Sequence, residues 1–187
     1  MAAIELASTE GFTRSAADVS LRRLVHYSLS PVMKSAFEQV YGPPYLARML
    51  FAEVGARPED DLFLRVEYDG EIVSNGATYA RARQDFAVLS GTHQSVELME
   101  AVLKSEHKPD ASFEAAVNSA LDAWSVGHML LQANETKELP ARDAITQHRQ
   151  EQLAIAAIEA AVLERDGSKA IRYRSLGDKE LRSVVTQ

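Results

Sequence analysis

The sequence predicts an α+β fold, with strands and amphipathic helices following one another along 187 residues. Residues 62–68 carry apolar side chains at every second position, which is typical of a half-buried strand. Asp69-Gly70 comes directly afterwards and supplies the two residues of a tight hairpin turn, so a second strand is expected next. Residues 92–106 and 113–124 instead space their apolar side chains three and four positions apart, as helices do.

Composition limits the classes of function. The length suits one domain, which we take to be residues 1–187. A net charge of -7 argues against a nucleic-acid partner, and the absence of cysteine excludes disulfides, zinc–thiolate sites and cysteine nucleophiles. No apolar run approaches the roughly 20 residues of a membrane helix, and the first residues lack the pattern of a signal peptide. We therefore expect a cytoplasmic protein with no membrane partner.

A long helix is expected before the hairpin, after a short strand at residues 4–8. Asp18 or Ser20 is the expected N-cap of this helix. Pro31 has no N–H to donate to the carbonyl of Tyr27, so a kink or break is expected there. The apolar stripe is predicted to comprise Leu21, Leu24, Val25, Ser28, Val32, Ala36 and Val40. Gly42-Pro43-Pro44 then ends the helix, and residues 47–54 form the next strand.

Residues 85–89 are predicted to form a strand that runs into Ser90-Gly91-Thr92, and the second half is predicted to be mostly helical from there. Thr92 is the expected cap of the helix over 92–106, whose stripe is Val96, Met99, Val102 and Leu103. Either Asp110 or Ser112 caps the following helix, whose stripe is Phe113, Val117, Ala120, Leu121 and Trp124. The polar stretch 133–151 is interpreted as a loop.

The segment 152–164 is ambiguous from its residues alone. Its alanine content favours a helix, whereas its apolar character on both alternating faces is typical of a buried strand. Asp166-Gly167 and a probable strand over 169–174 come next, which suggests a hairpin. Ser175 to Asp178 resembles a capping box that opens a last short helix through Val185.

The order of these elements resembles the C-terminal half of a proteasome α-type subunit, particularly the bacterial kind. The short matches are Asp18-Val19-Ser20, Pro44-Tyr45, Ala52-Glu53-Val54, Tyr68-Asp69-Gly70, Gly91-Thr92 and the 153–163 stretch. The resemblance implies the αββα sandwich of the N-terminal-nucleophile (Ntn) hydrolase and proteasome fold, here truncated at its N-terminus. It also favours a strand over 158–163. The family's gating tail and activator-binding lysine precede the matched part and are not transferred to this chain.

A sheet cut out of such a sandwich has a bare edge and an uncovered apolar face. Three outcomes stay open: a separate chain supplies the missing strands, the remaining elements repack, or the chain is a fragment that folds poorly.

No catalytic, metal or cofactor site is predicted. Gly91-Thr92 resembles the processing site of a threonine nucleophile, but such a threonine needs a free α-amine and should start a strand. Here the pair opens a helix, so a glycine turn followed by a cap is favoured. No two histidines show the one-helix spacing of a metal site. The chain's histidines are His26, His93, His107, His128 and His148.

Two further features allow a structural and a functional interpretation. Arg22, Arg23, Arg81 and Arg83 are individually more typical of a solvated face than of ion pairs across a ring interface. The stripe from Phe113 to Trp124 is more typical of core than of a ligand pocket, but it becomes a docking surface if that helix lies on the outside. Residues 57–61 are interpreted as a solvated charged turn.

The leading hypothesis is a non-catalytic, oligomeric structural or interaction protein linked to intracellular protein degradation, with protein partners such as proteasome α and β subunits or further copies of itself. The alternatives are an Ntn hydrolase of the same superfamily and an unrelated α+β binding module. A helix throughout 153–163 would favour the last of these.

Overall fold

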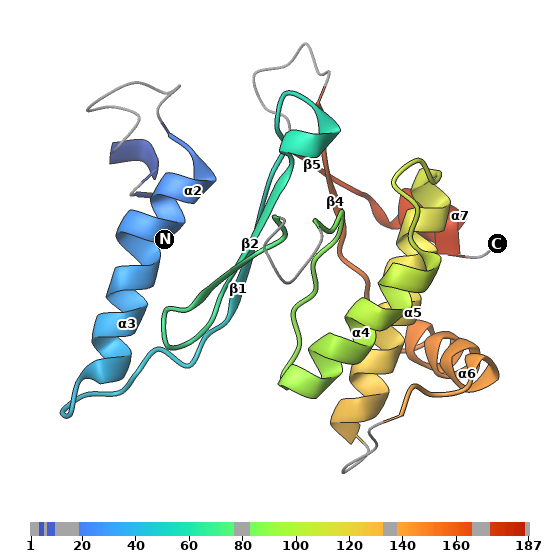
Figure 1. Cartoon of the computed structure of the whole chain (residues 1–187). Coiled ribbons are helices and arrows are strands. Elements are labelled where there is room, and N and C mark those ends of the chain that lie inside the picture. Colours follow the sequence, from blue (N-terminus) through green and yellow to red (C-terminus); the bar gives the residue numbers. More distant parts are fainter. Residues whose placement is uncertain are drawn as a thin grey trace. The chain divides into compact units, whose positions relative to one another are not determined.

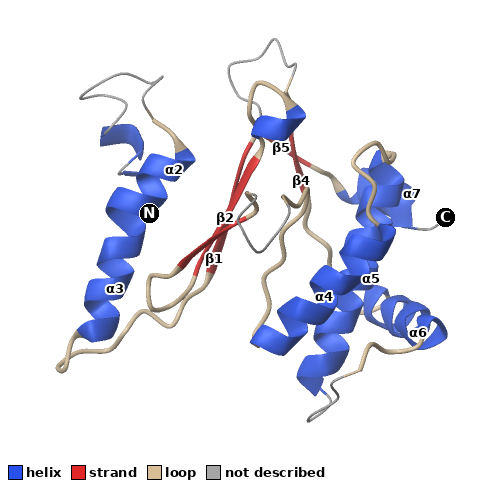
Figure 2. Ribbon diagram, in the orientation of Figure 1, coloured by secondary structure: helices blue, strands red, loops and turns tan. Residues whose placement is uncertain are grey.

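The computed structural model of the chain describes residues 4–5, 7–9, 19–76, 83–132, 138–165 and 173–185. Its contacts divide the chain into two compact units, Met1–Leu89 and Ser90–Gln187. The first unit combines a long helix with a three-stranded sheet, and the second combines helices with a two-stranded sheet (Figures 1 and 2). This mixture of helix and sheet agrees with the predicted α+β class. Within the described ranges, no helix has both the length and the apolar character needed to span a bilayer.

The first residues are helical rather than extended. Positions 4, 5 and 7–9 adopt helical conformation, so the prediction of a strand at 4–8 is wrong at these positions. Glutamate and alanine, which occupy positions 5 and 7, favour helices more than strands. The expected cap Asp18 lies outside the described residues. The other candidate, Ser20, is the N-cap, because its Oγ accepts a hydrogen bond from the Arg23 backbone N–H at 3.3 Å.

The long helix passes Pro31 without a break. It consists of α2 (Leu21–Leu24), the π-helical turn η2 (Val25–Leu29) and α3 (Ser30–Glu38). In the π turn the Ser30 N–H donates to the carbonyl of Val25, five residues back. Proline cannot close the normal four-residue hydrogen bond, and a widened turn just before it lets the chain stay helical.

This turn also changes which residues face the sheet. The core side of the helix carries Leu21, Val25, Leu29 and Met33, each four residues from the next. The predicted stripe is therefore correct for Leu21 and Val25 but wrong for its other members. Val32 is 54% exposed, and Val40 lies beyond the helix and is 87% exposed. The prediction assumed a regular α-helical period, whereas the wider turn holds a four-residue repeat on one side.

The first sheet is an antiparallel meander in the order β1-β2-β3. Its strands are β1 (Met49–Glu53), β2 (Leu62–Val66) and β3 (Ile72–Ser74), and the 3-10 turn η3 (Pro58–Asp60) joins the first two. Phe51 pairs with Leu64, and Val66 pairs with Ile72. One face of β2 packs Leu62, Leu64 and Val66 against Val25 and Met33, forming the core of this unit. These three strands appear where the sequence predicts them. The further strand expected over residues 85–89 is not formed, because this segment joins no strand ladder among the described residues.

The hairpin turn has three residues, so the prediction of a two-residue turn is wrong in detail. Glu67 and Glu71 are bonded across the turn through the Glu67 N–H and the Glu71 carbonyl at 2.9 Å. The Gly70 N–H donates to the Glu67 carbonyl at 3.0 Å, and Gly70 has a positive φ, +86°. This is the pattern of a four-residue turn followed by a left-handed glycine. Asp69 contributes through its Oδ1, which accepts from the Glu71 N–H.

The Asn75 side chain makes hydrogen bonds both to the start of β2 and to the segment that follows β3. Its side chain is buried, with Oδ1 accepting from the Phe63 N–H at 2.9 Å and Nδ2 donating to the Gln84 carbonyl at 2.9 Å. The backbone of Asn75 bonds to the same two residues. The sequence predicts a turn around Asn75. In the structure the Asn75 side chain makes hydrogen bonds to the Phe63 and Gln84 backbone of the kind that a neighbouring strand would otherwise make.

Replacing Asn75 with alanine is expected to lower the free energy of unfolding by about 2 kcal/mol, since it leaves the buried Phe63 N–H without an acceptor. Urea denaturation followed by circular dichroism measures this change. Asn118→Ala is the control, because the Asn118 side chain bonds only within its own exposed helical turn. Equal destabilisation by the two substitutions would contradict the role given to Asn75.

The second unit begins with α4 (His93–Glu106) and α5 (Phe113–Gln132), which pack together. Thr92 caps α4 in a capping box with Ser95, as predicted. The predicted stripe of α4 is also confirmed, because all four of its residues are buried. Of the two candidate caps of α5, Ser112 accepts a hydrogen bond from the Ala115 N–H at 3.2 Å.

The predicted stripe of α5 is mostly wrong as a core. Phe113 and Trp124 are 39% and 38% exposed, and only Leu121 of that stripe is buried. The buried side instead includes Ala123, Ser125, Val126 and Gly127. A Cβ added to Gly127 would lie 2.4 Å from the Met99 sulfur, so small residues let α5 approach α4 closely. Phe113 and Trp124 were predicted to be core residues because they are large and apolar. The side of α5 that packs closely against α4 instead carries small residues.

The loop predicted over 133–151 is confirmed at residues 138–141 and wrong from Arg142 on. Helix α6 (Arg142–Leu153) occupies most of it, and residues 133–137 lie outside the described part. The helix ends at Leu153, and β4 (Ala161–Leu163) follows, so the strand predicted over 158–163 is confirmed for its last three residues. The segment 153–163 is therefore not one helix.

Strand β4 pairs antiparallel with β5 (Tyr173–Ser175), and Val162 lies opposite Arg174. The hairpin is confirmed in its strands, while the Asp166-Gly167 turn lies outside the described residues. Neither strand is buried, contrary to the apolar central strand that the sequence suggested. The last helix, α7 (Asp178–Val185), is present as predicted and starts just after Ser175 to Gly177.

Candidate interaction surface

Large apolar side chains gather on the solvent side of the first unit. We call this set the outer apolar surface; it comprises Tyr27, Val32, Phe37, Val40, Tyr41, Tyr45 and Leu46. Several are almost fully accessible, among them Tyr41 at 92%, Val40 at 87% and Leu46 at 86%. Tyr27 and Val32 are exposed positions of the long helix, Phe37 lies near its end beside Tyr68, and the others lie in the segment that joins α3 to β1.

The joining segment is shaped by its own residues and tied to the hairpin at both ends. Gly42 has φ +129°, and the two prolines that follow favour extended backbone, so the segment forms no helix or strand. Before it, the ring of Phe37 packs edge-on against Tyr68 with centroids 5.5 Å apart. After it, Arg48 pairs with Glu67 at 2.7 Å and lies 5.7 Å from the Tyr68 ring centroid.

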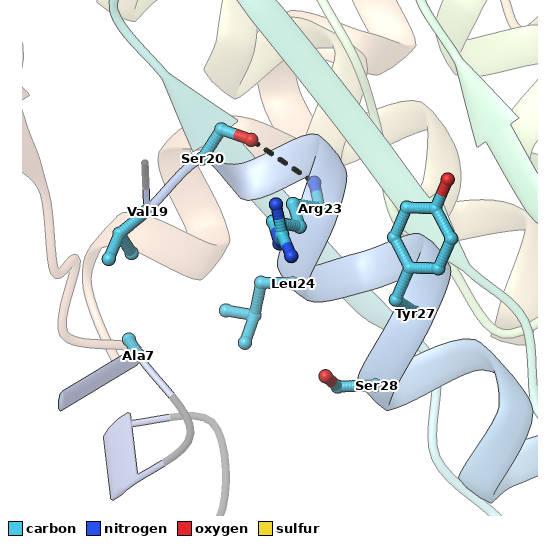
Figure 3. Close-up of a pocket in the computed structure, with 7 residues that line it drawn as sticks. All are labelled: Ala7, Val19, Ser20, Arg23, Leu24, Tyr27 and Ser28. Atoms are coloured by element: carbon cyan, nitrogen blue, oxygen red, sulfur yellow. Dashed lines mark hydrogen bonds between the residues drawn. The ribbon is translucent and has the colours of Figure 1, made fainter. Parts of the chain in front are cut away.

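A cavity of about 240 Å³ lies beside Tyr27 (Figure 3). Its lining consists of Ala7, Val19, Ser20, Arg23, Leu24, Tyr27 and Ser28. Arg23 projects among mainly small and apolar side chains, and the Ser20 cap bond closes the first turn of the helix. The lining offers one cation, hydroxyl groups and an aromatic edge. Among the described lining residues there is no carboxylate.

A second cavity, of about 380 Å³, is more strongly charged. Its lining includes Arg22 and Arg83 together with Glu53, Glu59, Asp60 and Asp61. Arg57 donates to Asp60 at 3.0 Å, and this hydrogen bond is the main reason that the pKa of the Asp60 carboxyl is lowered. Residues 57–61 thus form a charged turn with exposed ion pairs, as predicted.

The four arginines singled out by the sequence do not form one group. Arg23 lines the first cavity, while Arg22 and Arg83 line the second. Arg83 donates to the carbonyls of Pro58 and Asp61 at 2.7 and 3.2 Å, so it braces the charged turn. Arg81 lies outside the described residues.

Thr92 is engaged as a helix cap. Its Oγ1 accepts from the Ser95 N–H at 3.1 Å and lies 2.9 Å from the Ser95 hydroxyl. Among the described residues, no group of three or more histidine, aspartate, glutamate or cysteine side chains is arranged to hold a metal ion. His26 and His93 lie on exposed helix positions.

Sequence reasoning missed two polar clusters between helices of the second unit. Asp122, a buried residue of α5, pairs with Arg142 at 2.8 Å and Arg149 at 2.9 Å, both from α6. Arg142 also pairs with Glu106 of α4. Burial is the main reason that the pKa of the Glu106 carboxyl is raised, and it outweighs the opposing effect of Arg142.

The second cluster joins two histidines that are 20 residues apart in the sequence. His128 Nδ1 of α5 and His148 Nε2 of α6 are 2.9 Å apart. Trp124 stacks on His128 with ring centroids 5.0 Å apart and an angle of 9° between the rings. The sequence gave no signal for this contact, because the segment that holds His148 was interpreted as a loop.

Comparison with known proteins places these features in context. No protein-family model matches the chain. "Proteasome subunit alpha" of Actinosynnema mirum is 29% identical over 165 residues, which are 88% of this chain and 52% of that protein. The protein of the same description from Salinispora arenicola is 29% identical over 127 residues, or 67% of this chain and 42% of the relative.

A third relative, "Proteasome subunit alpha" of Streptomyces scabiei, is 25% identical over 181 residues, which are 95% of this chain and 60% of that protein. The chain spans about half the length of the curated relatives it matches. The resemblance predicted from the order of elements is therefore confirmed: over most of its own length, the chain is similar to part of the proteasome α subunit.

Proposed function

We propose that this protein is a non-catalytic structural or interaction protein, related to proteasome α subunits, that works in an oligomeric complex for intracellular protein degradation. The outer apolar surface, on a chain similar to subunits of such a complex, carries the proposal. The partners are proteins, either proteasome α and β subunits or further copies of the chain. The proposed location is the cytoplasm, and nucleic acids and membranes are not among the partners.

The energetics of the surface favour burial by a partner. Tyr41, Val40 and Leu46 are more than four-fifths exposed and lie within seven consecutive residues. Apolar area removed from water contributes about 25 cal/mol per Å² before the costs of association, and contiguous exposed apolar side chains mark protein contacts. Tyrosine is also enriched among the residues that dominate binding energy. A protein partner explains this composition better than a small-molecule ligand does.

The sheets support assembly as well. The two outer strands of the first sheet have no further strand partner among the described residues, and β4 with β5 forms a sheet of only two strands. Such edges bind additional strands readily, and an isolated two-stranded sheet is marginally stable. We propose that residues 1–187 act as one domain of an Ntn-type αββα sandwich, completed by strands that a separate chain supplies.

The absence of catalysis is part of the proposal. Nucleophiles of the Ntn class use a free α-amine on the first residue as the base. Thr92, which resembles such a nucleophile in its sequence context, has its nitrogen within the chain and its hydroxyl bonded to Ser95. Its geometry fits a cap.

The test is to purify the chain alone and with proteasome α- and β-type subunits, then to measure particle mass by native mass spectrometry and light scattering. The wild-type chain is expected in particles larger than a monomer. The double variant Tyr41→Ser, Leu46→Ser is expected to weaken assembly at least about tenfold, the change that ~1.4 kcal/mol of lost contact energy produces.

Ile155→Ser is the matched control, since it removes an apolar side chain that is 80% exposed outside the outer apolar surface. Circular dichroism checks that every variant is folded. A wild-type chain that stays monomeric in every mixture would overturn the proposal, and equal assembly of the double variant would remove the outer apolar surface from it.

A further inference from the structure

Helix α6 is held to the rest of its unit mainly by polar contacts. The side chain of Ile145 is the buried one among its described residues. Three positions that share its inner face, His148, Arg149 and Gln152, are polar and half-buried, and the last helix residue, Leu153, is a half-buried apolar one. Most helices in globular proteins gain their stability from an apolar face, which this helix largely lacks. The protonation state of the polar residues on this face should therefore affect the stability of the contact between α6 and α5.

The contact between His128 of α5 and His148 of α6 depends on how many protons the two imidazole rings carry. His128 Nδ1 and His148 Nε2 lie 2.9 Å apart, a hydrogen-bond distance between ring nitrogens. Such a bond needs a protonated nitrogen on one ring and a lone pair on the other, so at least one imidazole must be neutral. When both rings are charged, neither facing nitrogen can accept, and two positive charges meet at close range.

The surroundings make a second proton costly. Trp124 covers one face of His128 and also lies near His148, with ring centroids 6.4 Å apart. Burial, followed by the charge of His128, lowers the pKa of His148. Glu151, one turn along α6, acts in the opposite direction but is itself bonded to Gln147 at 2.8 Å.

The other charges at the α5–α6 contact are already paired with one another. Asp122 of α5 binds Arg149 and Arg142 of α6, and Arg142 also reaches Glu106 of α4. Gln132, the neutral neighbour on α5, lies 3.4 Å from the far nitrogen of His128. Thus, among the described residues, no carboxylate is bonded to either imidazole to stabilise the doubly charged state.

We propose that His128 and His148 form a pH-sensitive latch, which holds α6 against α5 at neutral pH and releases it under mildly acidic conditions. The sign follows from linkage. A histidine whose pKa falls on folding binds fewer protons when docked, so docking is fully favoured above the ordinary value of about 6.5 and weakens as the pH falls through the lowered value. This inference does not rest on the proposed function.

Amide hydrogen exchange of the full chain at pH 7.5 and pH 5.0 tests the latch, with each rate divided by the intrinsic rate at that pH. The wild-type protection of α6 is expected to fall at least about tenfold at the lower pH, equivalent to ~1.4 kcal/mol. Protection of α4 is expected to change much less. A titration of the imidazole carbon-bound protons by NMR should show that the pKa of His148 lies below the ordinary histidine value of about 6.5.

His148→Gln keeps a hydrogen-bonding side chain but removes the second titrating ring, and it should abolish the pH effect on α6. His93→Gln is the matched control and should retain it. Any contribution from Glu106 would persist in His148→Gln, which separates the two causes. The NMR titration needs only the wild-type chain, so the latch stays testable if a variant fails to fold. Unchanged α6 protection at pH 5.0, or a loss of protection in His148→Gln as large as that of the wild type, would overturn the proposal.

Discussion

Replacing Asp122 with alanine is expected to lower the free energy of unfolding of the second unit by about 3–5 kcal/mol. Its carboxylate is 4% exposed and pairs with Arg149 and Arg142, so the substitution leaves the guanidinium of Arg149 largely buried without its counter-ion. Removing one member of a buried ion pair costs more than the pair itself contributes, because the remaining charge cannot recover its hydration. Urea denaturation monitored by fluorescence of the single tryptophan, Trp124, reports on this region directly.

Asp143→Asn is the control for charge alone, since Asp143 is an exposed residue in the first turn of α6. It is expected to cost less than about 1 kcal/mol, as surface charges and helix-end charges do. If Asp122→Ala were as mild as this control, the cluster around Asp122 would not hold α6 in place.

Replacing Gly70 with valine should destabilise the first unit by roughly 2–5 kcal/mol. Left-handed backbone costs a side-chain-bearing residue about 1–2 kcal/mol, and overpacking typically adds about 1–3 kcal/mol. Both penalties apply at Gly70, because its φ is +86° and an added Cβ would lie 2.6 Å from the Ser30 carbonyl oxygen and 2.9 Å from the Lys34 nitrogen. The neighbouring atoms belong to helix backbone and have little room to yield.

The Gly70 substitution should also separate the helix from the hairpin, because the Ser30 hydroxyl donates to the Gly70 carbonyl at 2.6 Å. Thermal denaturation followed by circular dichroism measures the loss. Gly177→Ala is the matched control, since no atom lies within 4 Å of its added Cβ. A Gly70→Val protein as stable as Gly177→Ala would show that the hairpin does not rest on the helix as described.

Features encoded by neighbouring residues could be predicted from the sequence. Thr92 caps α4 through a residue three positions away, and the Leu62–Val66 strand shows its period-two pattern without help from other segments. The position of the hairpin was likewise predicted, although its turn type was not. Local hydrogen bonds and side-chain periodicity are physical properties of short segments, so short segments reveal them.

Features that depend on contacts between segments were missed. Helix α6 presents histidine and arginine on its inner face, so no apolar stripe identified it. These residues can be half-buried because their partners lie on α5: Arg149 pairs with Asp122, and His148 contacts His128. Val32 and Val40 of the outer apolar surface were assigned to the core-facing stripe for the converse reason, since an amphipathic pattern cannot show which of two apolar sides meets the sheet.

The π turn at Val25–Leu29 has a consequence for how the chain tolerates changes in length. A turn closed five residues back contains one residue more than an α-helical turn, and such turns are equivalent to a single insertion absorbed within a helix. A version lacking one residue here could restore ordinary α-helical bonding and leave both helix ends where they are. Gaps of one position in alignments of this helix would therefore signal an interchange between two turn types rather than a different fold.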